Sequence, residues 1–257
     1  MTAQTDFPTA PLPIPGTVNF RAASPASAGL RPGVLFRADA LGAVGDDGRR
    51  ALVDLGIRRI VDLRSDQETA EAPDDVDGTG IEVVHVPIMG GSVQDSLAQL
   101  FGGGGLTLAT LYATMLRDGG AAFARVLGLV AEGGPTVIHC TAGKDRTGIA
   151  VALSLLAVGV PLDDVVADYA RTEANLAGPW VEAMAARIAA YGIPFDGTLQ
   201  EIVSGSPAEA IRTALDEVVL VDGSADAYLD GIGVDAALRA RLRTALLADD
   251  EDPGDGA

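Results

Sequence analysis

The sequence predicts an α/β fold, in which a mostly parallel central sheet is flanked by helices. Short runs of branched apolar residues alternate with segments of helical periodicity as far as Val158, and this alternation is typical of a parallel sheet covered on both faces. One predicted strand runs through a glycine-containing loop directly into an apolar helix, Gly148–Val158. From Pro161 onward the regular segments are helical in pattern, so we expect them to cover the sheet or to form a subdomain over it.

We predict strands where a short apolar run lies between turn-forming residues. These runs are too short for a typical helix and are rich in Val and Ile, which favour the extended chain. The predicted strands are Val34–Arg37, Ile60–Leu63, Ile81–Val86 and the segment from Pro135 to His139. The acidic stretch from Ser65 to Gly80 contains Pro and Gly, and we predict a loop there.

The helices of the first part are predicted from their ends as well as their periodicity. Asp46–Leu55 begins with acidic residues, which favour a helix N-terminus, and Gly56 follows its last residue. Ala121–Ala131 is likewise followed closely by glycine. The long segment Ser92–Arg117 has a helical pattern on both sides of a joint formed by Gly102–Gly105.

The second part of the chain is predicted to be helical. Its helices are Leu162–Asn175, Pro179–Ala190, Pro207–Val219, Ala225–Gly231 and Asp235–Ala248. No internal repeat and no long linker divides the chain, so we expect a single domain over residues 19–248. We expect residues 1–18, with their spaced prolines, to form an extended surface arm or to be disordered, and the acidic residues 249–257 to form a disordered tail.

Composition excludes several classes of function. The 257 residues include 36 acidic and 18 basic side chains, a formal net charge of -18, so a nucleic acid or an anionic membrane is not an expected partner. The single Cys excludes an intramolecular disulfide and a Cys-rich zinc site. The N-terminus lacks the basic and apolar regions of a secretory signal, and no apolar run is long enough for an integral membrane segment. We therefore expect a cytoplasmic protein, with export by a route that needs no N-terminal signal left open.

The candidate functional site is the stretch His139 to Gly148, with the sequence HCTAGKDRTG. It contains Cys140 and Lys144, the single Cys and the single Lys of the chain. A loop that curls from a strand onto a helix N-terminus points successive backbone N–H groups into one concavity. With the positive end of the helix dipole, this concavity binds a tetrahedral dianion. The predicted phosphate-binding residues are Thr141, Ala142, Gly143, Lys144, Asp145 and Arg146.

The residue types in this loop suit a reaction at phosphorus. A cysteine beside a helix N-terminus and cations is favoured as the thiolate, which makes Cys140 the predicted nucleophile. Arg146 carries the planar guanidinium that binds two phosphate oxygens at once. Thr147 can donate its hydroxyl to the sulfur when the sulfur leaves, and His139 supports the loop through hydrogen bonds from its ring. The alternative for Cys140, a buried structural thiol, leaves its spacing to Arg146 without a reason.

The motif HCxxGxxRTG resembles the phosphate loop of the cysteine-dependent protein tyrosine phosphatases. Together with Val34–Arg37 and Ile60–Arg64 upstream, it is most similar to the bacterial atypical tyrosine phosphatases of the mycobacterial tyrosine phosphatase B type. The resemblance covers nearly the whole chain, and it implies a protein tyrosine phosphatase-like fold and an enzyme that needs no metal or cofactor. It also implies hydrolysis of phosphomonoesters through a phosphocysteine at Cys140, and lid-like helices within about residues 162–220.

The general acid is marked less plainly than the nucleophile. Many tyrosine phosphatases carry it on a separate loop after Trp-Pro, but the single Trp of this chain, Trp180, lies after the candidate loop. The resembling family has an Asp at the position of Asp145, and we predict that Asp145 protonates the leaving oxygen. Asp62, Asp66 and Asp95 are the rival candidates. The structural alternative for Asp145 is a helix cap or an ion pair with a nearby Arg.

Lys144 and Arg64 bear on the substrate. Phosphoinositide phosphatases of the tumour-suppressor lipid phosphatase type resemble the loop and have a Lys at the position of Lys144, where a cation at the rim would favour a second substrate phosphate. Arg64 either assists at the phosphate site or forms a salt bridge with Glu68.

The sequence therefore predicts a protein tyrosine or dual-specificity phosphatase that acts on a phosphotyrosine protein or peptide and releases inorganic phosphate. The alternatives are a phosphoinositide or inositol phosphate phosphatase, and a phosphate-binding module with little catalysis.

Overall fold

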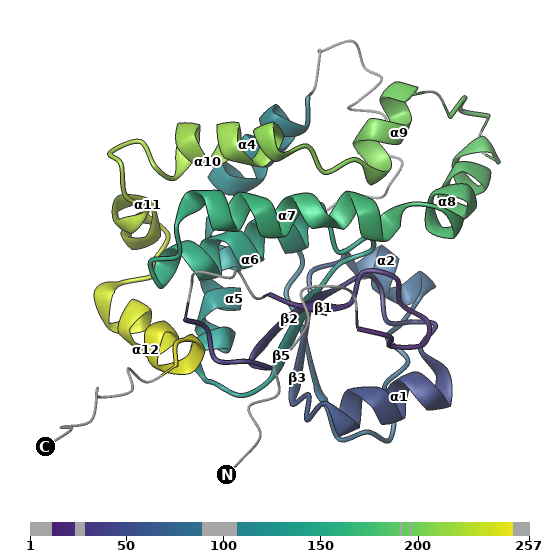
Figure 1. The fold of residues 1–257 in the computed structure, drawn as a ribbon, viewed down its shortest axis with the longest axis horizontal. Helices are drawn as coiled ribbons and strands as arrows, with labels where there is room; N and C mark the ends of the chain where they lie inside the picture. Colours follow the sequence, from purple (N-terminus) through teal and green to yellow (C-terminus); the bar gives the residue numbers. More distant parts are fainter. Residues whose placement is uncertain (1–11, 24–28, 89–106, 191, 196, 249–257) are drawn as a thin grey trace, which may run out of the picture.

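A five-stranded sheet forms the centre of a computed structural model that describes residues 12–23, 29–88, 107–190, 192–195 and 197–248 (Figure 1). The strands are β1 (Arg21–Ala22), β2 (Leu35–Ala38), β3 (Arg59–Asp62), β4 (Glu82–His85) and β5 (Thr136–His139). Their order in the sheet is β1-β2-β5-β3-β4. The last four strands of this order run parallel, and β1 lies antiparallel at one edge. The predicted mostly parallel α/β fold is confirmed.

Side chains of the central strands alternate between the two faces of the sheet, as the two-residue period of a strand requires. In β5, Val137 belongs to one core cluster and Ile138 to the other, and in β3 Ile60 and Val61 are divided in the same way. All four side chains are fully buried. Both faces of the sheet are therefore covered, which explains why these strands are apolar at consecutive positions.

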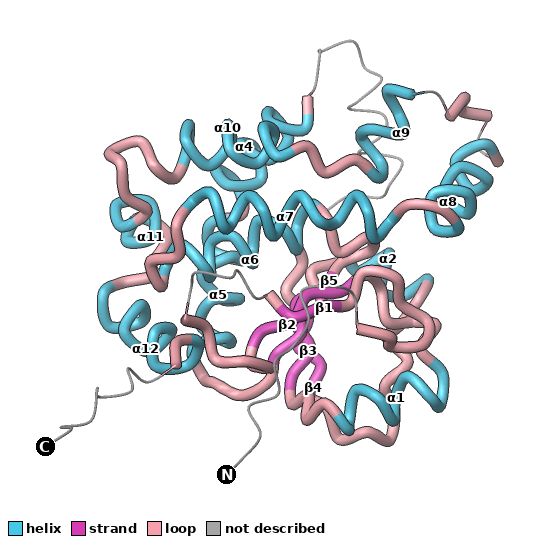
Figure 2. Tube along the Cα trace, in the orientation of Figure 1, coloured by secondary structure: helices cyan, strands magenta, loops and turns pink. Residues whose placement is uncertain are grey.

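The helices are divided unequally between the two faces of the sheet (Figures 1 and 2). Their bounds are α1 (Gly45–Asp54), α2 (Asp66–Glu71), α4 (Leu108–Asp118), α5 (Gly120–Ala131), α6 (Asp145–Ala157), α7 (Leu162–Leu176), α8 (Pro179–Ala189), α9 (Gly197–Ser204), α10 (Ala208–Val218), α11 (Asp226–Gly231) and α12 (Ala236–Leu246). α1 packs with the N-terminal segment on one face, while α4, α5, α6, α7, α10 and α12 build the larger core cluster on the other. The helical second part of the chain thus lies over one face, as predicted.

α6 lies in the middle of the larger core cluster, between β5, α5 and α7. Every side chain from Thr147 to Leu155 is buried. A helix that is apolar on all sides is expected to be surrounded by other elements, and α6 meets this expectation. Even so, the described part of the chain holds no helix with the length and apolar character needed to cross a membrane.

The structure contains β1, α2 and α9, which the sequence did not predict. β1 has two residues and is too short to show a strand period. α2 lies inside the predicted loop Ser65–Gly80, so the loop prediction is wrong for its first part. The predicted helix Ser92–Arg117 is described only in its second part, where α4 begins at Leu108, and the rest lies outside the described residues.

The segment that precedes β1 packs against the folded part of the chain. Ile14 is buried in the smaller core cluster, and the backbone N–H of Asn19 donates to the Asp39 carboxylate at 2.9 Å. Residues 12–18 therefore belong with the core, although the predicted arm included them. The remainder of the predicted arm, residues 1–11, and the acidic tail 249–257 lie outside the described residues.

Leu153 tests the central position of α6 in the core. Its side chain is fully buried, so Leu153→Ala leaves a cavity in the larger cluster and should lower the free energy of unfolding by about 3 kcal/mol. Chemical denaturation measures this change. Val221→Ala is the control, because Val221 is 70% exposed and its truncation should alter stability by less than about 0.5 kcal/mol. Equal effects of the two substitutions would contradict this account of the core.

Candidate active site

Cys140 stands at the carboxyl end of the central strand β5. β2 and β3 pair with β5 on either side, so the loop that follows β5 opens at the middle of the sheet edge, where open α/β sheets bind their ligands. Residues 140–144 join β5 to α6, which begins at Asp145. The Cys140 side chain is a free thiol with 2% of its surface exposed. The predicted nucleophile is therefore enclosed beside the N-terminus of a buried helix.

Two side chains hold the loop from behind by its carbonyl groups. The amide Nδ2 of Asn19 donates to the carbonyl oxygens of Ala142 and Gly143, at 3.0 and 3.2 Å. Arg37 Nη2 donates to the Gly143 carbonyl oxygen at 2.8 Å. Both Asn19 and Arg37 are fully buried, so these hydrogen bonds are shielded from water. They turn the carbonyl groups of the loop to one side.

The N–H groups of Gly143 and Lys144, which share peptide groups with the bound carbonyls of Ala142 and Gly143, point to the opposite side. In a trans peptide group the C=O and the N–H point in opposite directions, and the described residues contain no cis peptide bond. Within the described structure, no backbone N–H of residues 141–146 donates a hydrogen bond. The first N–H groups of α6 are likewise unpaired, as at any helix N-terminus. These groups and the positive end of the α6 dipole form a concavity suited to an anion.

Gly143 is required in this loop for two reasons. Its φ of +66° lies in the left-handed region, which side chains with a Cβ rarely adopt. A Cβ at this position would also lie 2.3 Å from the carbonyl oxygen of Ala38, at the end of β2. The loop therefore packs backbone to backbone against the neighbouring strand, which only glycine allows.

The arginines behind the loop belong to a buried network that reaches α7. Arg37 Nη1 forms an ion pair with Asp168 at 2.7 Å, and Arg21 Nη2 donates to the Thr172 hydroxyl at 3.0 Å. Arg21 Nε also lies 3.9 Å from Asp168 Oδ1, so the two arginines share this carboxylate. Burial, together with the neighbouring charge of Arg37, lowers the pKa of Arg21 to about 9. The network ties β1 and β2 at the start of the chain to a helix of its second part.

Arg146 is held in place by the carboxylate of Glu68, which was not among the predicted site residues. Its Nη1 and Nη2 donate to the two carboxylate oxygens of Glu68, at 2.7 and 2.8 Å. The Thr141 hydroxyl donates to the same carboxylate at 2.5 Å. Burial alone would raise the pKa of Glu68, but the hydrogen bonds and charge of Arg146 outweigh it and lower the pKa to about 2. Glu68 therefore stays charged and fixes the guanidinium that is predicted to bind phosphate.

Glu68 reaches the loop because α2 begins with a capping box. The Ser65 hydroxyl accepts from the backbone N–H of Glu68 at 3.2 Å, and the Glu68 carboxylate accepts from the N–H of Ser65 at 2.9 Å. The spacing of a Ser and a Glu three residues later is a recognised helix-start pattern, so the sequence did contain a signal for this residue. The acidic and Pro-containing residues that follow obscured it.

The sequence predicted Lys144 at the rim of the site, but in the structure it is buried. Its side chain is fully buried, and its ammonium donates to the carbonyl oxygens of Ile202 and Gly205, the latter at 3.0 Å. Ile202 lies in the last turn of α9 and Gly205 just beyond it. The negative end of this helix dipole attracts the cation. Lys144 also lies 3.4 Å from the Asp145 carboxylate.

Arg64 has a structural position rather than one facing the loop. Its guanidinium forms two hydrogen bonds with Asp62, at 2.9 and 2.8 Å, and an ion pair with Asp74 at 2.8 Å. The predicted partner Glu68 binds Arg146 instead. Of the two alternatives given for Arg64, these contacts favour a salt bridge, but its partners are Asp62 and Asp74 and not Glu68.

His139 supports the loop from below. Its Nδ1 lies 3.3 Å from the carbonyl oxygen of Cys140, and its Nε2 lies 3.1 Å from the Asp74 carboxylate. Asp62, Asp74 and His139 present ligand atoms within 4.8 Å of one another. Because Arg64 already binds both carboxylates, these residues form an ion-pair cluster, and we do not assign a metal to them.

Thr147 lies in the first turn of α6 and is fully buried. Its hydroxyl has no hydrogen-bond partner among the described residues. A role for this hydroxyl when the sulfur leaves stays a prediction.

The candidates for general acid differ sharply in their surroundings. The Asp62 carboxylate is occupied by Arg64, and although burial raises the pKa of Asp62, the hydrogen bonds from Arg64 lower it overall. The side chain of Asp66 is 94% exposed at the start of α2. Asp95 lies outside the described residues. Asp145, 27% exposed at the start of α6, is the described candidate that the loop itself carries.

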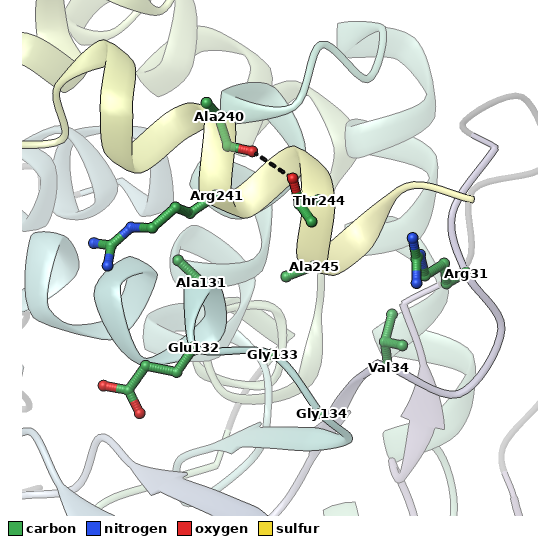
Figure 3. Close-up of a pocket in the computed structure, with 10 residues that line it drawn as sticks. All are labelled: Arg31, Val34, Ala131, Glu132, Gly133, Gly134, Ala240, Arg241, Thr244 and Ala245. Carbon is green, nitrogen blue, oxygen red and sulfur yellow. Dashed lines mark hydrogen bonds between the residues drawn. The ribbon is translucent and has the colours of Figure 1, made fainter. Parts of the chain in front are cut away.

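A separate hollow of about 480 Å³ lies at the other end of the sheet (Figure 3). Gly133 and Gly134 line it just before β5, whereas Cys140 follows β5, so the hollow is remote from the candidate site. Figure 3 shows the side chains of Arg241 and Glu132 on one side of it and Arg31 on the other. We assign no function to it.

Comparison with known proteins identifies the family. The family model described as "Tyrosine phosphatase family" matches residues 12–248. The chain belongs to the tyrosine phosphatase family. The protein named "Triple specificity protein phosphatase PtpB" of Mycobacterium tuberculosis is 33% identical over 270 residues, which cover 91% of this chain and 98% of that protein. A protein of Cupriavidus necator, whose name places it among the tyrosine-protein phosphatases, is 35% identical over 81% of this chain and 77% of its own length.

One solved structure shows a distant resemblance to this phosphatase. The crystal structure of Pseudomonas aeruginosa TpbA covers 70% of this chain and 94% of its own, with 18% identity and a TM-score of 0.32. That score is too low to add to the family assignment. The family match by itself confirms the prediction of a phosphatase enzyme related to the bacterial tyrosine phosphatases. The roles of individual residues in this tyrosine phosphatase remain predictions.

Glu68→Gln tests whether the ion pair between Glu68 and Arg146 is needed for hydrolysis of a phosphate ester. Gln keeps the size of the side chain but removes the charge that fixes the guanidinium, and we expect kcat/KM for an aryl phosphate to fall by about 10- to 100-fold. Steady-state kinetics measures this change. Glu71→Gln in the same helix is the control, because the partners of Glu71 among the described residues are the exposed side chains of Gln67 and Arg187. Equal losses in both variants would contradict the assigned position of Glu68.

The same ion pair predicts a pH dependence of stability. The pKa of Glu68 in the folded state, about 2, lies below its ordinary value of 4.5, so its stabilising effect is complete above the ordinary value and is lost as the pH falls towards 2. The free energy of unfolding should therefore decrease with falling pH more steeply in the native protein than in Glu68→Gln. Denaturation at a series of pH values measures both slopes. Parallel curves would show that Glu68 does not contribute.

Proposed function

We propose that this protein hydrolyses phosphotyrosine in proteins or peptides through a phosphocysteine at Cys140. One observation supports this proposal above all others. Cys140 lies within a loop whose carbonyl groups are held outward by Asn19 and Arg37, while its N–H groups stay unpaired with other described residues. Such a loop offers one concavity for a phosphate dianion, with a thiol at the base of the loop and a fixed Arg146 at its end.

The proposed reaction has two steps. The Cys140 thiolate attacks phosphorus while the bond from phosphorus to the tyrosine oxygen breaks, and Asp145 gives its proton to that oxygen. A water molecule then attacks the phosphocysteine, and the Asp145 carboxylate takes its proton. The bond from phosphorus to sulfur breaks, which releases inorganic phosphate and restores the thiolate. The loop N–H groups and Arg146 bind the phosphoryl oxygens in both steps.

A phosphoinositide is the second candidate substrate. PtpB, one-third identical to this chain, is named a triple-specificity phosphatase, which favours a substrate range wider than phosphotyrosine. Lys144 could contact a second phosphate only if its ammonium left the carbonyls of Ile202 and Gly205. One enzyme preparation assayed on phosphotyrosine peptides and on phosphoinositide vesicles, with Lys144→Ala alongside, decides between the two. A loss confined to the lipid supports the second candidate, and an equal loss on both removes it.

We also propose that residues 12–248 form one phosphatase domain, in which the helices within residues 162–220 act as a lid over the site. The contact of Lys144 with the end of α9 supports a lid, because it brings this region against the phosphate loop. We retain the cytoplasm as the expected place of action. A phosphate-binding module with little catalysis is disfavoured by the presence of both Cys140 and Arg146.

Cys140→Ser tests the nucleophile. A serine hydroxyl is a far weaker nucleophile than a thiolate, so hydrolysis of an aryl phosphate should fall below detection while phosphate binding is retained. A phosphate-release assay and calorimetric titration with a phosphotyrosine peptide measure the two properties. Retained hydrolysis would overturn the proposed mechanism.

Asp145→Asn tests the acid. An aryl oxygen with strongly withdrawing substituents leaves without a proton, whereas a phenol or an alcohol needs one. We expect kcat to fall by about 100-fold or more for phenyl phosphate and by only a few-fold for 2,4-dinitrophenyl phosphate. An equal loss on both substrates would mean that the acid lies elsewhere.

A further inference from the structure

Asp145 is contacted by a buried tyrosine from a different part of the chain. The Tyr112 hydroxyl, in the middle of α4, donates to Asp145 Oδ1 at 2.5 Å. The Tyr169 hydroxyl, on α7, lies 2.6 Å from the Tyr112 hydroxyl. The two rings meet edge to face, with centroids 5.9 Å apart and an interplanar angle of 82°. Three separate helices thus meet at one carboxyl group.

The direction of the two hydrogen bonds follows from the number of protons. A tyrosine hydroxyl has one proton to donate, and Tyr112 donates it to Asp145. Tyr169 must therefore donate to Tyr112. The two residues form a short chain that ends on Oδ1.

Both tyrosines remain donors in the folded protein. Burial, and then the negative charge of Asp145, raise the pKa of Tyr112 well above its ordinary value, and the same two causes raise the pKa of Tyr169. Both side chains are almost fully buried, with exposed fractions of 0% and 1%. A donor that never ionises can hold the carboxyl group in its charged and in its neutral form alike.

We infer that Tyr112, supported by Tyr169, is a positioning residue that fixes the Asp145 carboxyl group so that Oδ2 carries the transferable proton. A free carboxyl group rotates readily, because the terminal torsion of Asp is broad. A hydrogen bond to Oδ1 removes this freedom and makes the two oxygens different. Lys144 lies on the same side, 3.4 Å from Oδ1, and is itself held by two carbonyl groups. Oδ2 is then the oxygen left to face a substrate.

This inference rests on the proposed role of Asp145 as the acid. A merely structural role for the tyrosine pair would affect folding and would lower all activity equally. A positioning role has a different signature, because it acts only where a proton must be transferred. The ratio of kcat values for a poor and a good leaving group, measured in one preparation, separates the two, since the amount of folded enzyme cancels.

Tyr112→Phe is the test, with Tyr169→Phe as a milder variant and Tyr228→Phe as the matched control. Tyr228 also has a partly buried hydroxyl, but it donates to the Leu116 carbonyl oxygen at 2.7 Å and is not part of the hydrogen-bond chain that ends on Asp145. We expect Tyr112→Phe to lower kcat for phenyl phosphate by about 10- to 100-fold, with KM nearly unchanged and 2,4-dinitrophenyl phosphate affected by no more than about 2-fold. Tyr169→Phe should show the same selectivity with a smaller loss, and Tyr228→Phe should show none.

The test is completed by comparing Tyr112→Phe in the native protein with Tyr112→Phe combined with Asp145→Asn. If Tyr112 acts through Asp145, adding Tyr112→Phe to Asp145→Asn should cause no further loss on phenyl phosphate. If Asp145→Asn discriminates between leaving groups and Tyr112→Phe does not, the inference is overturned while the proposed function stands. If Asp145→Asn itself shows no discrimination, the proposed acid and this inference are both wrong.

Discussion

The whole arrangement depends on the hydrogen bonds that hold the loop carbonyl groups away from the anion. A peptide chain does not keep several N–H groups pointing into one space unless the opposite ends of the same peptide groups are bound. Asn19 and Arg37 bind these ends from buried positions behind the loop. Gly143 permits the resulting conformation, and no other residue type fits against the backbone of Ala38. Asn19, Arg37 and Gly143 thus form a supporting frame that positions the loop, and through it Cys140 and Arg146, from the side away from the anion.

That frame also connects distant parts of the chain. Arg37 reaches Asp168 of α7, and Arg21 reaches Thr172 one turn later. Loss of one partner from a buried ion pair typically costs about 3–5 kcal/mol, because the remaining charge is stranded away from water. The helical second part of the molecule is thus required for the shape of a loop that belongs to the sheet.

The sequence indicated where the candidate loop lies in the fold, but not the long-range contacts around it. The loop from Cys140 to Arg146 has a fixed spacing and could be recognised alone, and the strands had clear apolar patterns. Glu68 could have been found from its spacing to Ser65, but nothing local indicated that it would reach Arg146. The burial of Lys144 depends on carbonyl groups 58 and 61 residues further along the chain, and such long-range contacts are not visible in local periodicity. The same is true of the contact between Tyr112 and Asp145, which are 33 residues apart in the chain. Propensity and periodicity report local preference, whereas these contacts are decided by packing.

The central claim is that the loop transfers the phosphoryl group to the sulfur of Cys140, and trapping the intermediate tests it most directly. The enzyme is mixed with an excess of an activated aryl phosphate, quenched within its first turnovers, digested and examined by mass spectrometry. The account predicts one phosphoryl group on the peptide that contains Cys140, and none on that peptide when Cys140 is replaced by Ser. A phosphoryl group on another residue, or turnover without any phosphorylated peptide, would contradict it.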